Sequence, residues 1–419
     1  MFTIRLSSRI QRIKPSATFA VSNRAEKLKA EGKDVIGLGA GEPDFDTPEH
    51  IKEAAIRAIR DGFTKYTAVD GIPSLKKAII DKFKRDNALD FTPDQILVSA
   101  GGKHSFFNLA QALLETGDEV VIPAPYWVSY PDIVLLADAT PVIISTGIDQ
   151  GFKVLPEQLD MALAYTTKLA VINSPSNPTG SVYTRAELEA LGEVLRRYPN
   201  TLIATDDMYE HILWSGEPFC NIATACPDLR ERTIVLNGVS KAYAMTGWRI
   251  GYAAGPKTLI AAMKNIQSQS TSNPTSIAQV AAEAALNGDQ GCILPMVRAF
   301  HERHEWLVKS LNAIDGVRCI PSDGTFYSFP SIQEAIAKQP GIKNDVEMAE
   351  HILNQAGVAL VPGSAFGAKG YIRLSFATSM DNLTGRRKAP RRPFWQPLKA
   401  KKRTASGLLR KRFSRCIIC

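Results

Sequence analysis

The chain has 419 residues, a length that predicts two domains or one large domain with a smaller one. Its 45% hydrophobic and 22% charged residues are typical of a soluble globular protein. Thirteen of its 50 basic residues lie in residues 385–419, which contain no acidic residue. The rest of the chain contains the other 37 basic residues and 42 acidic residues, so its net charge is −5. The positive charge of the protein therefore belongs to this tail.

Composition and charge also disfavour a membrane-spanning protein and a nucleic-acid-binding protein. No apolar run approaches the roughly 18 residues that a membrane-spanning helix needs. A nucleic-acid-binding protein that uses the basic tail is an alternative, but the acidic main part and the lack of a recognition motif argue against it. The six cysteines have no regular spacing and follow no secretory signal, which predicts reduced thiols and a cytoplasmic protein. We expect no metal site.

Short apolar segments alternate with helical patterns over much of the chain. Strands are expected at residues 96–99, 119–122, 168–172, 201–204, 233–236 and 250–254, and helices at 48–61, 102–114 and 185–198. This alternation predicts an α/β fold with a mostly parallel sheet that is covered by helices on both faces.

A helical region is expected from about residue 275 to 311, leading to a second, smaller α+β domain. We therefore predict a small domain from residues 1–46 and 297–384 and a large domain from residues 47–296.

Polar residues follow several of the predicted strands. Asn177, Asp206, Tyr209 and Lys241 all come just after such segments. Because the carboxyl ends of parallel strands meet at one edge of a sheet, we expect these four side chains to lie close together. A lysine in such a place can form a Schiff base if its surroundings keep part of it neutral.

A phosphate site is indicated earlier in the chain. Gly101 and Gly102 stand between a predicted strand and the start of a helix. Free backbone N–H groups and the helix dipole both favour an anion at such a helix start.

Four segments in a fixed order resemble the class I pyridoxal-phosphate-dependent aminotransferases. They are NSPSNPTG at 173–180, TDDMYE at 205–210, NGVSKAYAMTGWRIG at 237–251 and YIRLS at 371–375. The similarity extends from residue 7 to residue 383. It implies the fold of the type I pyridoxal-phosphate enzymes, pyridoxal 5′-phosphate as cofactor, and amino acids and 2-oxo acids as substrates. Lys241 would be the Schiff-base and proton-transfer residue.

The resemblance also implies roles around the cofactor ring. Asp206 would face the pyridine nitrogen, where an anion favours the protonated ring. Asn177 and Tyr209 would donate hydrogen bonds to the phenolic oxygen of the ring, and Trp127 would stack on it. Asp207 departs from the family, which more often has glutamate at this position.

The cofactor phosphate would be held by residues of two subunits. Gly101, Gly102, the adjacent Lys103 and Arg249 would bind it from one chain, and Tyr66 would reach it from the neighbouring one. The resemblance therefore implies a homodimer with shared active sites.

Substrate recognition follows the same resemblance. Arg373 would hold the α-carboxylate bidentately, a task that suits a planar guanidinium, and the backbone of Gly41 would lie beside it; Trp127 and Asn177 would also border the substrate. The segments KPSAT, GEPDFDTP, GGK and PYWVSYP resemble the bacterial-type branch of aspartate aminotransferases.

In that branch Lys103, helped by Thr18, would bind the distal carboxylate of aspartate or glutamate. Lys14 stands where a basic residue accompanies prephenate transamination. An aminotransferase for aromatic or neutral amino acids on the same scaffold is the alternative.

The similarity stops at the basic tail. The family continues after Leu383 into an amphipathic helix, whereas Pro390, Pro393 and Pro397 forbid a continuous helix here. An acid-free run with 13 basic residues repels itself. We expect residues 385–419 to be disordered and irrelevant to the chemistry, and the abrupt change of composition suggests a shifted reading frame.

Overall fold

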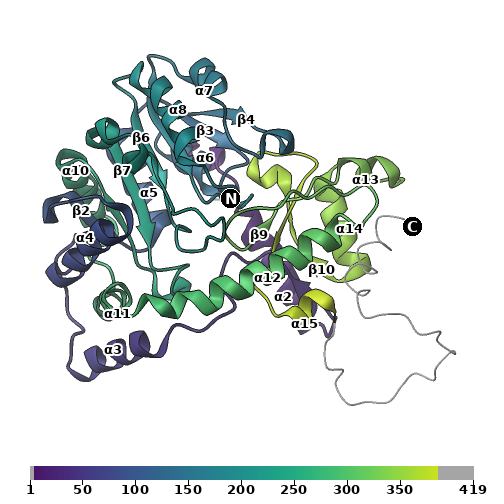
Figure 1. Ribbon diagram of the computed structural model, residues 1–419, viewed down its shortest axis with the longest axis horizontal. Helices are drawn as coiled ribbons and strands as arrows, with labels where there is room; N and C mark the ends of the chain where they lie inside the picture. Colours follow the sequence, from purple (N-terminus) through teal and green to yellow (C-terminus); the bar gives the residue numbers. More distant parts are fainter. Residues whose placement is uncertain (1–3, 386–419) are drawn as a thin grey trace. The chain divides into compact units, whose positions relative to one another are not determined.

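The computed structural model describes residues 4–385, and the chain divides into two compact units (Figure 1). The large unit contains the described residues up to Ser16, Phe45–Ala299 and Ser322–Thr325. The small unit contains Ala17–Asp44, Phe300–Pro321 and the described residues from Phe326 onward. Residues 4–16 thus group with the large unit, whereas the sequence-based division assigned residues 1–46 to the small one. The predictions for the basic tail concern residues outside the described ones, apart from Gly385.

A seven-stranded sheet forms the centre of the large unit, in the order β2-β8-β7-β6-β5-β3-β4. Strand β8 runs antiparallel to both of its neighbours, and all other neighbouring pairs are parallel. The prediction of a mostly parallel sheet is therefore confirmed. The edge strand β4 was not predicted. The strands are β2 (Ile96–Ser99), β3 (Glu119–Ala124), β4 (Thr140–Ser145), β5 (Thr167–Asn173), β6 (Leu202–Asp206), β7 (Thr233–Gly238) and β8 (Gly251–Ala254).

Alternate residues of the strands face two separate hydrophobic cores. On β5, Leu169 and Val171 belong to one core, and Ala170 and Ile172 belong to the other. All four side chains are buried, and burial of a side chain as large as those of Leu169, Val171 and Ile172 contributes roughly 1.5–3 kcal/mol to stability. Helices cover both faces: α5 (Gly102–Leu113), α6 (Ser129–Leu136) and α10 (Lys257–Ser268) on one, and α7 (Pro156–Ala162), α8 (Arg185–Arg196) and α9 (Ile222–Ala225) on the other.

The helical region that was predicted over residues 275–311 is interrupted. Helix α11 (Ser276–Asn287) ends at Gly288, whose backbone is extended, and α12 begins only at Leu294 (Leu294–Leu311). A Cβ at Gly288 would lie 2.7 Å from both the carbonyl oxygen of Ala284 and Nε2 of His50, so the chain passes too close for a side chain. The Asp289 carboxylate then accepts from the N–H of Gly291 and begins a separate 3-10 turn, η5 (Gln290–Ile293).

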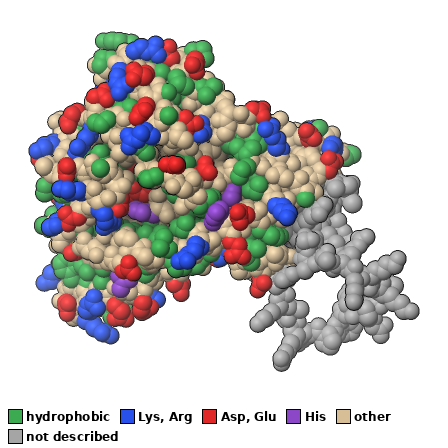
Figure 2. All heavy atoms as spheres, in the orientation of Figure 1, with side chains coloured by type: hydrophobic (Ala, Val, Ile, Leu, Met, Phe, Trp, Pro, Cys, Tyr) green, Lys and Arg blue, Asp and Glu red, His purple; other side chains and the backbone are tan. Residues whose placement is uncertain are grey.

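The remaining helices of the large unit are α1 (Ser8–Arg12), α3 (Glu49–Arg60) and α4 (Pro73–Asn87), with 3-10 turns η1 (Pro93–Gln95), η2 (Ile148–Gln150), η3 (Pro227–Arg232) and η4 (Thr246–Trp248). Within the part of the chain that the structure describes, no helix is long and apolar enough to cross a membrane. On the face drawn in Figure 2, basic and acidic side chains of the described residues are interspersed.

Two small sheets organise the small unit. Strands β1 (Ile36–Gly37) and β10 (Val358–Ala359) pair in parallel, and β11-β12-β9 form an antiparallel sheet. The further elements are β11 (Val361–Pro362), β12 (Ile372–Ser375), β9 (Tyr327–Ser328), α2 (Ala17–Ala30), α13 (Gln333–Lys338), α14 (Asp345–Ala356), η6 (Gly363–Phe366) and α15 (Met380–Thr384). Ser379 caps the start of α15, because its hydroxyl accepts from the N–H of Asn382 at 3.2 Å.

Candidate active site

Several loops of the large unit meet at one edge of the seven-stranded sheet. Strands β5, β6 and β7 are parallel, so Asn173, Asp206 and Gly238 mark the same edge. Because β8 runs the opposite way, its first residue, Gly251, lies at this edge too and pairs with Gly238 and with Ser99. The topology thus gathers the loops that carry most of the predicted cofactor site: Gly101, Gly102, Lys103, Trp127, Asn177, Asp206, Tyr209, Lys241 and Arg249.

Lys241 interacts with both Tyr209 and Asp206. The ammonium nitrogen of Lys241 lies 5.9 Å from the centroid of the Tyr209 ring. Burial raises the pKa of the Asp206 carboxyl above its ordinary value, whereas hydrogen bonds and the charge of Lys241 act in the opposite direction. The structure therefore brings together the lysine and the carboxylate that the sequence analysis assigned to opposite ends of one cofactor ring.

Both carboxylate oxygens of Asp206 have a donor. The phenol of Tyr130 donates to Oδ2, and the backbone N–H of Met208 donates to Oδ1 at 3.3 Å. Asn173 fixes the same turn, because its Nδ2 donates to the carbonyl oxygen of Asp206 at 3.0 Å. Sequence reasoning missed Tyr130, which follows the predicted Trp127 by three residues.

The loop that carries Asn177 is tied to the strand before it. Oδ1 of Asn173 accepts from the backbone N–H of Asn177 at 2.9 Å. The loop closes through a hydrogen bond from the N–H of Gly180 to the carbonyl oxygen of Ser176 at 2.8 Å. Gly180 has a φ of +73°, and a Cβ there would lie 2.6 Å from the hydroxyl oxygen of Ser322, so glycine is required.

Glycines leave a cradle at the start of α5. Gly101 has a φ of +92°, and a Cβ on it would lie 2.1 Å from Nη2 of Arg249. A Cβ on Gly102 would lie 2.4 Å from Cε of Met208. The first turn of a helix offers N–H groups without intrahelical partners, and together with the adjacent guanidinium they suit a phosphate group. These residues fit the phosphate that the resemblance implies.

The guanidinium of Arg249 is held at this cradle by backbone oxygens. Its Nη1 donates to the carbonyl oxygen of Thr246 at 2.9 Å, and Nη2 donates to that of Ala100 at 3.3 Å. Burial lowers the pKa of Arg249.

Lys103 places a second cation beside the cradle. Its ammonium lies 5.2 Å from the centroid of the Trp127 ring, in a cation–π arrangement. Burial and the charge of Arg249 both lower the pKa of Lys103. Lys103 and Arg249 thus add two positive charges to this edge of the sheet.

Two predicted residues of the large unit stand apart from these contacts. Tyr66, between α3 and α4, is 91% exposed. Lys14 is exposed. Burial raises the pKa of the Asp132 carboxyl, and the backbone and charge of Lys14 oppose this rise.

The small unit holds the other predicted substrate residues. Arg373 on β12 is 2% exposed, and its Nη2 donates to the carbonyl oxygen of Gly39 at 2.7 Å. Its guanidinium lies 4.4 Å from the Tyr327 ring centroid, and a Cβ on Gly41 would lie 2.8 Å from the hydroxyl oxygen of the same tyrosine. Arg373 and Gly41 thus share one neighbourhood. The half-buried Thr18 lies near the start of α2.

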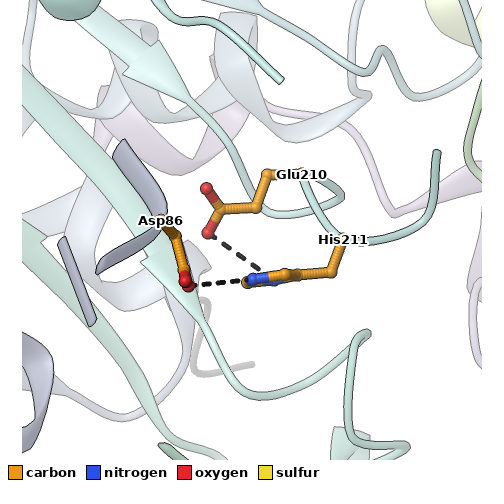
Figure 3. Close-up of side chains that lie close together, drawn as sticks. All are labelled: Asp86, Glu210 and His211. Carbon is orange, nitrogen blue, oxygen red and sulfur yellow. Dashed lines mark hydrogen bonds and ion pairs between the residues drawn. The ribbon is translucent and has the colours of Figure 1, made fainter. Parts of the chain in front are cut away.

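Asp86, Glu210 and His211 form a cluster whose ligand atoms are close enough to hold a metal ion (Figure 3). Nε2 of His211 lies 3.0 Å from Oδ2 of Asp86, and Nδ1 lies 3.7 Å from Oε1 of Glu210. The ammonium of Lys82, 0% exposed, is paired with Glu210 and lies 4.0 Å from Oδ2 of Asp86. Asp86 also accepts from Nε and Nη2 of Arg85, at 2.7 and 3.0 Å. Lys82 and Arg85 together supply the two positive charges that the two carboxylates require, so we assign the cluster a structural role.

Glu210 connects this cluster to the candidate active site. Its carboxylate accepts from Nδ2 of Asn87 on α4 at 2.8 Å and from Nδ2 of Asn237 at the end of β7 at 2.7 Å. Tyr209 directly precedes Glu210, and Lys241 follows Asn237 by four residues. The hydrogen bonds of Glu210 therefore stabilise the loop of Tyr209 and the loop of Lys241.

Asp207 lies beside this network in a fully buried position. It accepts from the hydroxyl of Thr205 and from Nδ2 of Asn221, each at 2.6 Å. Burial raises its pKa to about 8, and the charge of Glu210 adds to the effect. Asp207, which stands where the family more often has glutamate, is thus a buried carboxyl group with its own hydrogen-bond partners.

Comparison with known proteins defines the class. The family described as aminotransferase class I and II matches residues 33–385, and the chain belongs to this family. It is a pyridoxal-phosphate-dependent aminotransferase, whose substrates are amino acids and 2-oxo acids.

Individual relatives cover nearly the whole chain. An aspartate/prephenate aminotransferase of Nitrosomonas europaea is 64% identical over 91% of this chain and 97% of its own length. The solved aspartate aminotransferase of Rhizobium meliloti is 48% identical, with a TM-score of 0.87, over 91% of this chain and 96% of that one. That of Thermus thermophilus with maleate is 41% identical, with a TM-score of 0.88, over 99% and 100%. These similarities confirm the predicted fold class, enzyme class and cofactor.

Proposed function

We propose that the enzyme transfers the amino group of aspartate or glutamate to 2-oxoglutarate or oxaloacetate, and that prephenate is a further acceptor. The observation that carries this proposal is the Lys103 ammonium, which lies beside Arg249 and over Trp127. A second cation beside the phosphate cradle suits a substrate with a second carboxylate. The names of the relatives, and the maleate with the Thermus thermophilus enzyme, support the same substrate class.

We further propose the following roles for residues of the large unit. Bound pyridoxal phosphate supplies the electron sink for the reaction. Lys241 holds the cofactor covalently and moves the proton at the substrate Cα as general base and acid. Asp206 faces the ring nitrogen, and Asn177 and Tyr209 donate to the phenolic oxygen. Trp127 covers the ring, while Gly101, Gly102 and Arg249, with the adjacent Lys103, hold the phosphate.

Substrate carboxylates are assigned to three further places. Arg373, with the backbone of Gly41 beside it, binds the α-carboxylate through its planar donors. Lys103, helped by Thr18, binds the distal carboxylate of aspartate or glutamate. Lys14 contributes to prephenate recognition.

Replacement of Lys103 by alanine tests the specificity. Any loss of phosphate binding affects all substrates alike. If the ammonium also binds the distal carboxylate, kcat/KM should fall further for aspartate than for alanine or phenylalanine, and the extra loss of transition-state stabilisation should be about 1.5–3 kcal/mol, the range for a hydrogen bond to a charged group. Lys257→Ala is the matched control, because that lysine is exposed on α10 and pairs with Asp94. An equal loss for every amino acid would refute the assignment and favour the alternative, an aminotransferase for aromatic or neutral amino acids.

We also propose a homodimer in which Tyr66 of one chain reaches the cofactor phosphate of the other. The nearly complete exposure of Tyr66 in the single chain supports a role in contact with another chain. Mixing Tyr66→Phe and Lys241→Ala subunits should then restore activity, because a hybrid dimer contains one site with both native residues. Activity no higher than the sum of the separate variants would argue against shared sites.

A cytoplasmic location completes the proposal. The cysteines of the described part, Cys220, Cys226, Cys292 and Cys319, are all free thiols, which suits a reducing compartment. Recovery of the enzyme in a periplasmic or membrane fraction would contradict this location.

A further inference from the structure

We infer that Tyr130 is a positioning residue for the cofactor ring, because its phenol binds Asp206 and its aromatic ring supports Trp127. The inference rests on the proposed function, since it takes Asp206 to face the ring nitrogen and Trp127 to cover the ring. According to this inference, the buried side chain of Tyr130 orients both Asp206 and Trp127.

Packing fixes the ring of Tyr130 tightly. The residue lies on α6, is 1% exposed and belongs to the hydrophobic core beneath α5 and α10. Its ring centroid is 4.8 Å from that of Phe106 and 5.1 Å from that of Trp127, with the Trp127 plane inclined by 82°. Edge-to-face aromatic pairs of this kind are favourable and directional. Tyr130 therefore restricts the orientation of the indole.

The hydroxyl of the same side chain restricts Asp206. It donates to Oδ2, while Met208 donates to Oδ1 from the other side. Burial, followed by the charge of Asp206, raises the pKa of Tyr130 well above its ordinary value. The phenol consequently stays protonated and remains a donor to the carboxylate.

This hydrogen bond acts on the proton that a carboxylate and a ring nitrogen would share. Burial alone makes Asp206 hold a proton more strongly, and the hydrogen bond from Tyr130 opposes that effect. With the phenol present, the proton rests more readily on the nitrogen and the negative charge on Asp206. Without it, the carboxylate competes for the proton and the attraction for the protonated ring weakens.

The test compares cofactor affinity in Tyr130→Phe and in the wild-type enzyme. Apoenzyme is titrated with pyridoxal phosphate, and binding is followed by absorbance. The variant keeps the aromatic packing, so it should fold, but loss of a hydrogen bond to a charged group should weaken binding by about 10-fold or more. The turnover number for aspartate should fall, whereas KM should stay unchanged because Tyr130 is not placed against the substrate.

Tyr183→Phe is the matched control. This tyrosine is also buried, and its hydroxyl accepts from the N–H of Val154 at 2.8 Å in the core on the opposite face of the sheet. Its replacement should lower thermal stability without changing cofactor affinity. A loss of cofactor affinity as large as that of Tyr130→Phe would overturn the inference, because the effect would then be general destabilisation.

A double-mutant cycle with Asp206→Asn separates this inference from the proposed function. If Tyr130 acts through the carboxylate, Tyr130→Phe should weaken binding far less in the Asp206→Asn background. Equal effects in both backgrounds, or no effect of Tyr130→Phe beside a clear effect of Asp206→Asn, would overturn the inference alone. A wild-type chain without covalently bound cofactor, or an Asp206→Asn variant of unchanged affinity, would overturn both.

Discussion

Replacement of Lys241 by alanine should abolish transamination, with a loss of more than about 10⁴-fold in turnover, because both covalent attachment and proton transfer are proposed to depend on one amino group. The purified variant should lack the absorption band of the lysine-bound cofactor, and borohydride should fix no cofactor to the chain. The wild-type band should change when aspartate is added. The cradle formed by Gly101, Gly102 and Arg249 is untouched, so the variant should still bind the cofactor non-covalently.

Lys257→Ala, on the exposed side of α10, should behave like the wild-type enzyme in the same measurements. A covalent adduct that persists in Lys241→Ala would assign the attachment to another lysine. In that event the contact between Lys241 and the Tyr209 ring would require a different explanation.

The site residues that sequence reasoning found share a simple physical origin. Buried parallel strands are recognisable as short apolar runs, and their carboxyl ends meet at one edge, so the positions of Asp206 and Lys241 in the sequence suffice to group them. Arg249 reaches the same edge for a reason that the sequence did not indicate. It precedes β8, which runs antiparallel to its neighbours, and so it is the amino end of that strand that lies here.

Groups that act through long-range contacts could not be predicted. Tyr130 and Asp206 are 76 residues apart, and in the sequence Tyr130 is part of an apolar segment that is typical of a core helix. Likewise, Lys82 falls in an ordinary pattern of charged residues on α4, and only the fold places its ammonium beside Glu210. The close approach of His50 to Gly288, where the predicted helix is interrupted, likewise joins residues that are far apart in the sequence.

Replacement of Lys82 by methionine should destabilise the large unit severely. The change removes a fully buried ammonium and leaves the carboxylate of Glu210, which is 5% exposed, without its closest cation. Removal of one partner of a buried ion pair costs about 3–5 kcal/mol of unfolding free energy. Lys77→Met on the same helix is the matched control. Its exposed ammonium pairs with Asp81 at 2.5 Å, and loss of such a pair should cost less than about 1 kcal/mol in urea unfolding.

The loss in Lys82→Met should depend on pH in a defined direction. Burial acts to raise the pKa of Glu210, but Lys82 and the hydrogen-bond donors outweigh it, so the pKa in the native protein is lowered. The ionised group therefore stabilises the wild-type fold above its ordinary pKa, and this contribution is lost as the pH falls through the native pKa.

Without Lys82, burial should instead raise the pKa of Glu210, so that the variant fold binds a proton more strongly than the unfolded chain. The variant should then become less stable as the pH rises, and the difference in unfolding free energy from the wild type should be larger at about pH 8 than at about pH 5. A difference that is independent of pH, or equal losses in Lys82→Met and Lys77→Met, would show that the buried ammonium does not neutralise Glu210. The cluster of Asp86, Glu210 and His211 would then have to be reconsidered as a site for another cation.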